Sequence, residues 1–253
     1  MPPPPLVYDG RMGKRVLLGM LTPSSNTVLE PMTGAMIAGL AEVSAHFGRF
    51  RVIEISLGKQ AHQQFDDGPI LEAARLLADA RVDVIAWNGT SASWLGFDTD
   101  ERLCRRIGEE TGCPATTSVL ALNEVFRVTG VERFGLVTPY VDAIQDAILD
   151  NYRAAGFRCV AERHRGESVN FAFSEVSEST IRTMLGEVAE AEPQAVTTLC
   201  TNLRGAPLAE GFERETGIPL YDSVSVVVWK SLKLAGVDPG RVKGWGRLFA
   251  DMA

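Results

Sequence analysis

The second half of this chain repeats landmarks of its first half, and this duplication constrains the fold more than any other feature of the sequence. The motifs GMLTP and ETGCP, with an apolar run between them that ends in small polar residues, return in the same order as GLVTP and ETGIP. The pairs lie at residues 19–23 and 135–139, 82–91 and 195–202, and 110–114 and 215–219. Such a repeat predicts two similar lobes related by a pseudo-twofold axis.

Each half alternates short apolar runs with amphipathic stretches of helical period. The expected strands are residues 15–21, 82–87, 133–137 and 195–199, and the expected helices include residues 69–80, 100–111, 142–155 and 175–191. Nearly continuous apolar strands separated by helices are typical of a parallel sheet covered on both faces. We therefore expect an α/β fold with two pseudo-symmetric, Rossmann-like lobes, each a mostly parallel sheet flanked by helices.

The same duplication predicts where a ligand binds. In open α/β sheets, ligands bind beyond the carboxyl ends of the strands, so two lobes that face each other form one cleft. Gly89 and Cys200 occupy matched positions after the apolar runs, and we expect both to face this cleft. We assign residues 15–118 plus 222–253 to the first lobe, 119–221 to the second, and the proline-rich residues 1–14 to a disordered tail.

Composition and missing motifs exclude several function classes. The 253 residues are 45% hydrophobic with a net charge of −7, which suits a substantial core and opposes nucleic-acid binding. The sequence shows no membrane-spanning run and no apolar signal segment, so we expect a cytoplasmic protein that does not bind a membrane. Phosphate-loop, dinucleotide-binding and nucleophile-elbow motifs are absent, and His46, His62 and His164 lack metal-ligand spacing. We expect no cofactor and no metal, and the sequence leaves both a monomer and a homo-oligomer open.

Cys200 is the strongest candidate for a catalytic residue. It ends an apolar strand and opens a polar turn that contains Thr201 and Asn202. A thiol with a pKa of about 8.5 is mostly protonated near neutral pH and can donate a proton or ionise. The other cysteines lack C-x-x-C spacing and suit the ordinary role of a small buried hydrophobe; they are Cys104, Cys113 and Cys159.

The turn matched to Cys200 is suited to binding an anion. Gly89 is followed by Thr90 and Ser91, so backbone N–H groups and two hydroxyls are available to a substrate carboxylate. Helix capping is the competing structural role of these side chains. The turns after the strands of the first motif pair offer further candidates, which are Pro23, Ser24, Asn26 and Tyr140. Asn26 could equally cap a helix, and Tyr140 could equally serve only in packing.

These motifs together resemble the aspartate/glutamate racemase superfamily, in its branch of arylmalonate decarboxylases and maleate cis-trans isomerases. TPSSNT at 22–27 resembles the substrate loop of the isomerases, whereas GTSAS at 89–93 and GRLF at 246–249 resemble the decarboxylases. The turn with Tyr140 resembles that of both groups, and Cys200 falls at their shared catalytic cysteine. The resemblance covers nearly the whole chain after the tail and implies a cofactor-independent enzyme that acts on a small carboxylate.

The resemblance also separates two mechanisms. The racemases and isomerases are similar in using one cysteine from each lobe, whereas arylmalonate decarboxylase has glycine in the first lobe and one cysteine in the second. Gly89 cannot exchange a proton or add to an alkene, so we expect a malonate-type decarboxylase in which Cys200 protonates an enediolate held in an oxyanion hole. Isomerisation or racemisation of a small dicarboxylate stays open, because Asn26 follows the isomerase pattern. Thr201, Asn202 and Arg204 replace the small apolar or glycine residues of the decarboxylase and suggest a more polar substrate.

Overall fold

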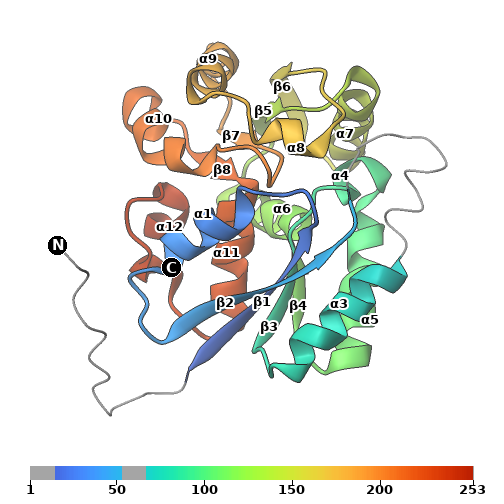
Figure 1. The fold of residues 1–253 in the computed structure, drawn as a ribbon. Coiled ribbons are helices and arrows are strands. Elements are labelled where there is room, and N and C mark those ends of the chain that lie inside the picture. The colour runs from blue at the N-terminus through green and yellow to red at the C-terminus, as the bar shows by residue number, and fades with distance from the viewer. Residues whose placement is uncertain (1–14, 53–66, 253) are drawn as a thin grey trace.

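The computed structural model describes residues 15–52 and 67–252. The expected tail at residues 1–14 and His62 lie outside these ranges. Two four-stranded sheets form the framework of the molecule (Figure 1). Both are parallel throughout, as the sequence predicts, and nearly every residue of their central strands is buried.

The two sheets have the same topology. The first has the order β2-β1-β3-β4 and the second the order β6-β5-β7-β8, which is the same arrangement displaced by four strands. The first four strands are β1 (Val16–Pro23), β2 (Val43–Phe50), β3 (Val84–Trp87) and β4 (Ala115–Thr117). The second four are β5 (Arg133–Thr138), β6 (Arg158–His164), β7 (Ala195–Thr198) and β8 (Leu220–Asp222). The predicted duplication and the predicted α/β fold are thus confirmed.

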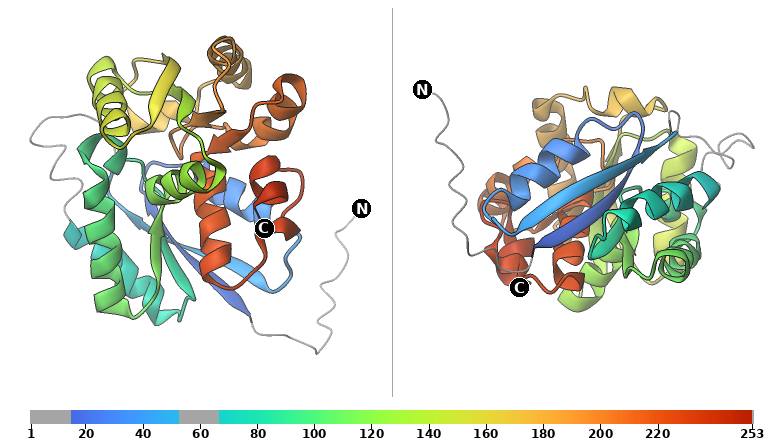
Figure 2. Two further views of the ribbon diagram at one scale, coloured as in Figure 1. Left: turned by 180° about the vertical axis from the view of Figure 1, so that it is seen from behind. Right: turned by 60° about the horizontal axis from the view of Figure 1, so that its bottom comes forward.

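Helices cover both faces of the first sheet, with α3 and α5 on one face and α1 and α11 on the other (Figure 2). The helices of the first half are α1 (Leu29–Ile37), α3 (Asp67–Asp79), α4 (Ala92–Leu95), α5 (Phe97–Thr111) and α6 (Ser118–Thr129). Those of the second half are α7 (Asp142–Ala154), α8 (Asn170–Phe173), α9 (Glu178–Ala189), α10 (Ala209–Thr216), α11 (Ser223–Leu234) and α12 (Arg247–Asp251). Short 3₁₀ turns lie at Ala206–Leu208 and Pro239–Arg241.

One predicted helix begins later than expected. Residues 175–177 precede α9 instead of belonging to it, because the Ser177 hydroxyl accepts a hydrogen bond from the Thr180 N–H at 3.1 Å and caps the helix there.

The two matched ETG motifs end their helices in the same way. Gly112 and Gly217 end α5 and α10 with φ angles of 71° and 73°, a left-handed conformation that glycine adopts without strain.

Two helices cross between the halves of the molecule. Helix α6 follows β4, yet its Phe126 packs against Phe134 and Phe157 of the second half, with ring centroids 5.3 and 5.4 Å apart. Helix α11 follows β8, yet it packs on β3 and β4 of the first sheet and against α6. The strands show where the sheets lie, but these crossing helices contact both, so the lobe boundaries at residues 118/119 and 221/222 stay a prediction.

Candidate active site

A pocket lies where the turns after the strands of the two sheets meet. Its opening included, it holds about 320 Å³. The first half contributes Pro23, Val52, Trp87, Gly89, Thr90, Ser91 and Trp94, and the second half contributes Tyr140, Asn170, Cys200 and Thr201. The position agrees with the rule that parallel sheets bind ligands beyond the carboxyl ends of their strands.

The structure brings most of the sequence-predicted residues to this pocket. Those in the lining are Pro23, Gly89, Thr90, Ser91, Tyr140, Cys200 and Thr201. Ser24, Asn26 and Asn202 are not part of the lining and have protein partners. The sequence analysis missed four lining residues, which are Val52, Trp87, Trp94 and Asn170. Three of these four are apolar, so the pocket is less polar than the motifs alone suggested.

Cys200 lies two residues beyond the end of β7 and is 3% exposed. The pKa of its thiol is raised to about 12, mainly by burial and to a smaller extent by the nearby Asp222 carboxylate. Hydrogen bonds from Tyr140 and from the backbone of Asn202 lower it, but by less than burial raises it. A thiol with this pKa is neutral at neutral pH, so it is equipped to donate a proton.

The Tyr140 hydroxyl lies between the two lobes. It is 2.6 Å from Thr90 Oγ1 and also forms a hydrogen bond with Cys200. Edge contacts with Trp94 and Phe173, at centroid distances of 5.2 and 5.5 Å, fix the ring. Burial raises the pKa of this phenol well above its usual value, and the proximity of Cys200 raises it as well. Tyr140 is therefore a neutral, positioned hydrogen-bond donor.

Two backbone turns that line the pocket have N–H groups available to an anion. Within the described residues, the N–H groups of Gly89, Thr90, Ser91 and Thr201 donate to no protein acceptor. The carbonyl of Thr90 accepts hydrogen bonds from the N–H and the hydroxyl of Ser93, at 3.0 and 2.6 Å. These bonds stabilise the turn at residues 89–91. N–H groups that have no protein acceptor are available to form an oxyanion hole without a charged side chain.

The polar residues after Cys200 bind loops of both halves, mostly of the opposite one. Thr201 donates to the carbonyl of Asn88 at 2.9 Å and accepts from the Asn26 amide at 3.1 Å. Asn202 accepts from the N–H of Thr27 at 3.0 Å and donates to the carbonyl of Asn170 at 2.5 Å. These contacts give the polar side chains at positions 201 and 202 a structural role. The sequence analysis instead related their polarity to a polar substrate.

The remaining predicted loop residues also have structural partners. The Asn26 side-chain oxygen accepts from the N–H groups of Val28 and Leu29, both at 2.9 Å, as a capping residue does. Ser24 accepts from the N–H of Val52 at 3.2 Å. A direct role of Ser24, Asn26 or Asn202 in substrate binding stays a prediction.

A buried carboxyl supports the turn that carries Cys200. Asp222 accepts a hydrogen bond from Thr198 at 2.6 Å and caps α11 by accepting from the N–H of Val224 at 2.8 Å. Burial raises its pKa to about 6, although its hydrogen bonds lower it. Asp222 is not part of the pocket lining, so we regard it as a residue that positions the end of β7.

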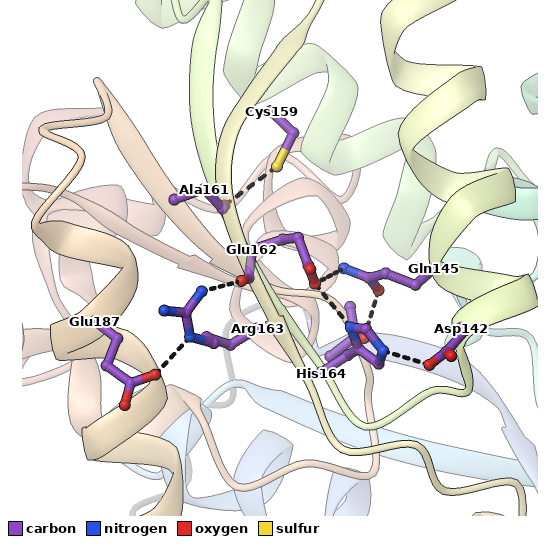
Figure 3. A network of polar contacts seen from close by, with 9 residues as sticks. Asp142, Gln145, Cys159, Ala161, Glu162, Arg163, His164 and Glu187 are labelled. Carbon is purple, nitrogen blue, oxygen red and sulfur yellow. Dashed lines mark hydrogen bonds and ion pairs between the residues drawn. The ribbon is translucent and has the colours of Figure 1, made fainter.

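The histidine that the structure describes in the second half lies outside the pocket. His164 is held between Glu162 and Asp142, with 2.8 Å on each side, and Gln145 extends this network to Thr138 (Figure 3). Burial lowers the pKa of His164, but the two acidic partners raise it by more.

Across the described residues, no group of three His, Cys, Asp or Glu side chains is arranged to hold a metal ion. In residues 15–52 and 67–252, every helix is too short or too polar to cross a membrane.

Comparison of the sequence with known proteins places the chain in a family. The sequence model of the family described as arylmalonate decarboxylase matches residues 18–249. An arylmalonate decarboxylase of Bordetella bronchiseptica is 25% identical over 233 residues, which are 90% of this chain and 97% of the relative. A maleate isomerase of Nocardia farcinica is 26% identical over 241 residues, covering 91% of this chain and 94% of the relative.

The fold is similar to that of solved structures as well. A mutant of the Nocardia farcinica maleate cis-trans isomerase with a covalently bound succinylcysteine intermediate superposes with a TM-score of 0.86. That likeness covers 95% of this chain and all of the other, at 23% identity, and it concerns the fold. Relatives with two different activities are thus about equally similar in sequence.

Proposed function

Because the chain belongs to the arylmalonate decarboxylase family, we propose that it is a cofactor-independent decarboxylase of a malonate-type acid that uses Cys200 as its proton donor. The observation that supports this proposal is the one-sided chemistry of the pocket. The second half contributes a neutral thiol, whereas the matched position of the first half is Gly89. The described lining contains no Asp, Glu, His, Lys or Arg side chain that could serve as a second acid or base.

The pocket offers different surroundings to the two carboxylates of a malonate. One carboxylate would accept hydrogen bonds from the N–H groups of the turns at Gly89 and Thr201 and from the Tyr140 hydroxyl. The other would lie against the apolar walls of Trp87, Trp94 and Val52, where a charge loses its hydration. Loss of carbon dioxide removes that charge from the apolar wall, so this arrangement favours decarboxylation.

The reaction then needs one proton. As the bond to the departing carboxyl breaks, its electron pair enters the remaining carboxylate and forms an enediolate, whose negative charge the oxyanion hole stabilises. The α-carbon takes a proton from Sγ of Cys200, and the resulting thiolate recovers its proton from solvent before the next turnover. The raised pKa of Cys200 supports this role, because a neutral thiol is ready to donate whereas a nucleophile must first ionise.

The apolar walls also define the substituent of the substrate. Two tryptophans, Val52 and Pro23 surround the site, and no cationic side chain is present in the described lining to bind a third carboxylate. We infer an α-aryl or α-alkyl malonate. The alternative function is the cis-trans isomerisation of maleate or racemisation of a related dicarboxylate, which the similarity to maleate isomerases favours.

Carbon dioxide release from aryl- and alkylmalonates tests the proposal. We expect turnover by the wild type, loss of turnover in Cys200→Ala, and no change in Cys159→Ala, a matched thiol on β6 outside the pocket. Maleate is assayed in parallel for conversion to fumarate. Conversion of maleate by a folded protein that decarboxylates none of the malonates would contradict the proposal and support the isomerase.

A further inference from the structure

The space beside Gly89 is filled by a tryptophan ring. A Cβ atom added to Gly89 would lie 2.0 Å from Cζ2 of Trp87 and 2.4 Å from its Cε2, far inside van der Waals contact. The backbone is not the obstacle, since Gly89 is not among the glycines with positive φ. The Trp87 ring, and not the chain conformation, therefore excludes a side chain at this position.

The ring has little freedom to move aside. Trp87 is 1% exposed, and its ring packs against Phe50 with centroids 5.0 Å apart. Trp87 also forms part of the pocket lining, so its ring is a wall of the site. Displacing a buried ring of this size would disturb both the core and the pocket.

The matched position of the second lobe has a different arrangement. Trp87 ends β3 two residues before Gly89, and Thr198 ends β7 two residues before Cys200. Side chains two residues apart lie on the same side of an extended strand. Thr198 is small and is held by Asp222 at 2.6 Å, so the space toward position 200 is left for a thiol. The first lobe thus has a large ring followed by a glycine at these two positions, whereas the second lobe has two small side chains.

We propose that Trp87 is a specificity-determining residue, whose ring occupies the space that an acid/base side chain at position 89 would need and so limits the site to one proton donor. The limit to one proton donor rests on the proposed function, whereas the steric exclusion by the Trp87 ring does not. The steric exclusion predicts that Gly89→Cys alone cannot build a two-thiol site in this chain. Gly89→Cys combined with a smaller residue at position 87 can build one.

A double-mutant cycle tests the steric part. Gly89→Cys is made in the wild type, in Trp87→Ala and in Trp94→Ala, and stability is measured by urea unfolding. Trp94→Ala is the matched control, because Trp94 is also a buried pocket tryptophan but is not among the atoms nearest the added Cβ. We expect Gly89→Cys to lower the unfolding midpoint in the wild type and in Trp94→Ala, and to lower it little or not at all in Trp87→Ala. If a variant does not fold, Gly89→Ala with Trp87→Leu gives the same comparison with a smaller change.

Isotope exchange tests the chemical part. With thiols on both faces, one thiolate can remove the α-proton of the product acid while the other thiol returns a proton on the opposite face. In D₂O we expect the Trp87→Ala, Gly89→Cys variant to exchange the α-hydrogen of an enantiopure 2-arylpropionate at least 10-fold faster than Gly89→Cys alone.

The two readouts separate the possible failures. An equal cost of Gly89→Cys in all three backgrounds would overturn the proposal, even if malonates are decarboxylated. Stability coupling confined to Trp87, in a protein that decarboxylates no malonate, would support the exclusion by Trp87 and contradict the proposed function. Rapid exchange by Gly89→Cys in the wild-type background would also overturn the proposal.

Discussion

The two lobes make equivalent contacts across the cleft but have different residues at the position just before those contacts. Thr90 and Thr201 are matched threonines, and each reaches across the cleft to the loop after the first strand of the opposite lobe, Thr90 to Tyr140 and Thr201 to Asn26. One residue earlier the symmetry ends, with Gly89 in the first lobe and Cys200 in the second. The duplicated fold therefore keeps the contacts that close the cleft and varies the position that determines the chemistry.

A second difference lies in how each lobe supports its turn. Thr117 caps α6 and Asp222 caps α11, so the matched helices that follow β4 and β8 begin alike. In the second lobe the carboxyl of Asp222 lies close enough to Cys200 to raise its pKa. In the first lobe the carboxyl is that of Asp100, which bonds to Thr117 and is not part of the pocket lining. Among the residues that line the pocket, the thiol therefore comes from the second lobe, where burial and, to a smaller extent, Asp222 keep it protonated.

The largest expected effect comes from removing the thiol of the second lobe. Cys200→Ala should lower the decarboxylation rate on the order of 10²–10⁴-fold, as the loss of a general acid does. Thermal unfolding should change far less than activity. A variant that retains most of its activity would show that the lobes differ in sequence but not in chemical role.

A smaller loss is expected from the hydroxyl that joins the lobes. Tyr140→Phe removes the hydroxyl that is hydrogen-bonded to Thr90 and should lower kcat about 10²–10³-fold, the usual cost of one oxyanion-hole donor. Tyr152→Phe is the matched control, because Tyr152 is also fully buried but its hydroxyl has no hydrogen-bond partner among the described residues. Equal losses in the two variants would assign Tyr140 to packing alone.

The buried carboxyl of the first lobe should affect stability and not catalysis. Burial raises the pKa of Asp100 from 3.8 to about 7, so the folded state holds this proton more tightly than the unfolded chain. Its contribution to stability is complete below pH 3.8 and is lost as the pH rises to about 7. At pH 8, Asp100→Asn should therefore raise the free energy of unfolding, by at most about 4 kcal/mol, with little change near pH 4. Asp150→Asn, at an exposed position, serves as the control, and a gain that is equal at both pH values would contradict this account.

The smallest effect is expected from the symmetric contact. Thr201→Val removes the hydrogen bonds to Asn88 and Asn26 and should lower the free energy of unfolding by about 1–3 kcal/mol. Thr183→Val, which removes an exposed hydroxyl on α9, should cost less. An unchanged stability in Thr201→Val would show that this contact does not hold the lobes together.

The sequence predicts the framework of the molecule because the framework depends on local patterns. The repeat of GMLTP and ETGCP predicts two like lobes, and the apolar runs predict parallel strands, since both features follow from periodicity and turn chemistry. Cys200 and Gly89 follow from the same repeat, because matched strands end at the same cleft.

The missed residues depend on tertiary contacts that no local pattern specifies. Asn170 reaches the pocket from the connection after β6, far from any motif, and Val52 follows the edge strand β2. Trp87 lies in the expected strand at residues 82–87, and its spacing of two from Gly89 is the one sequence signal that could have placed its ring on the same side as a side chain at position 89. The contacts of the Asn202 side chain with Thr27 and Asn170 are likewise not visible in the sequence, and its role in substrate binding stays a prediction.

The central claim is that protonation occurs from one face only. It is tested most directly by decarboxylating an α-methyl-α-arylmalonate in D₂O and measuring both the deuterium content and the enantiomeric composition of the product. With Cys200 contributed by the second lobe and Trp87 filling the space beside Gly89 of the first, we expect a single enantiomer with one deuterium at the α-carbon and no further exchange. A racemic product, or continued exchange of the α-hydrogen after the malonate is consumed, would contradict the account.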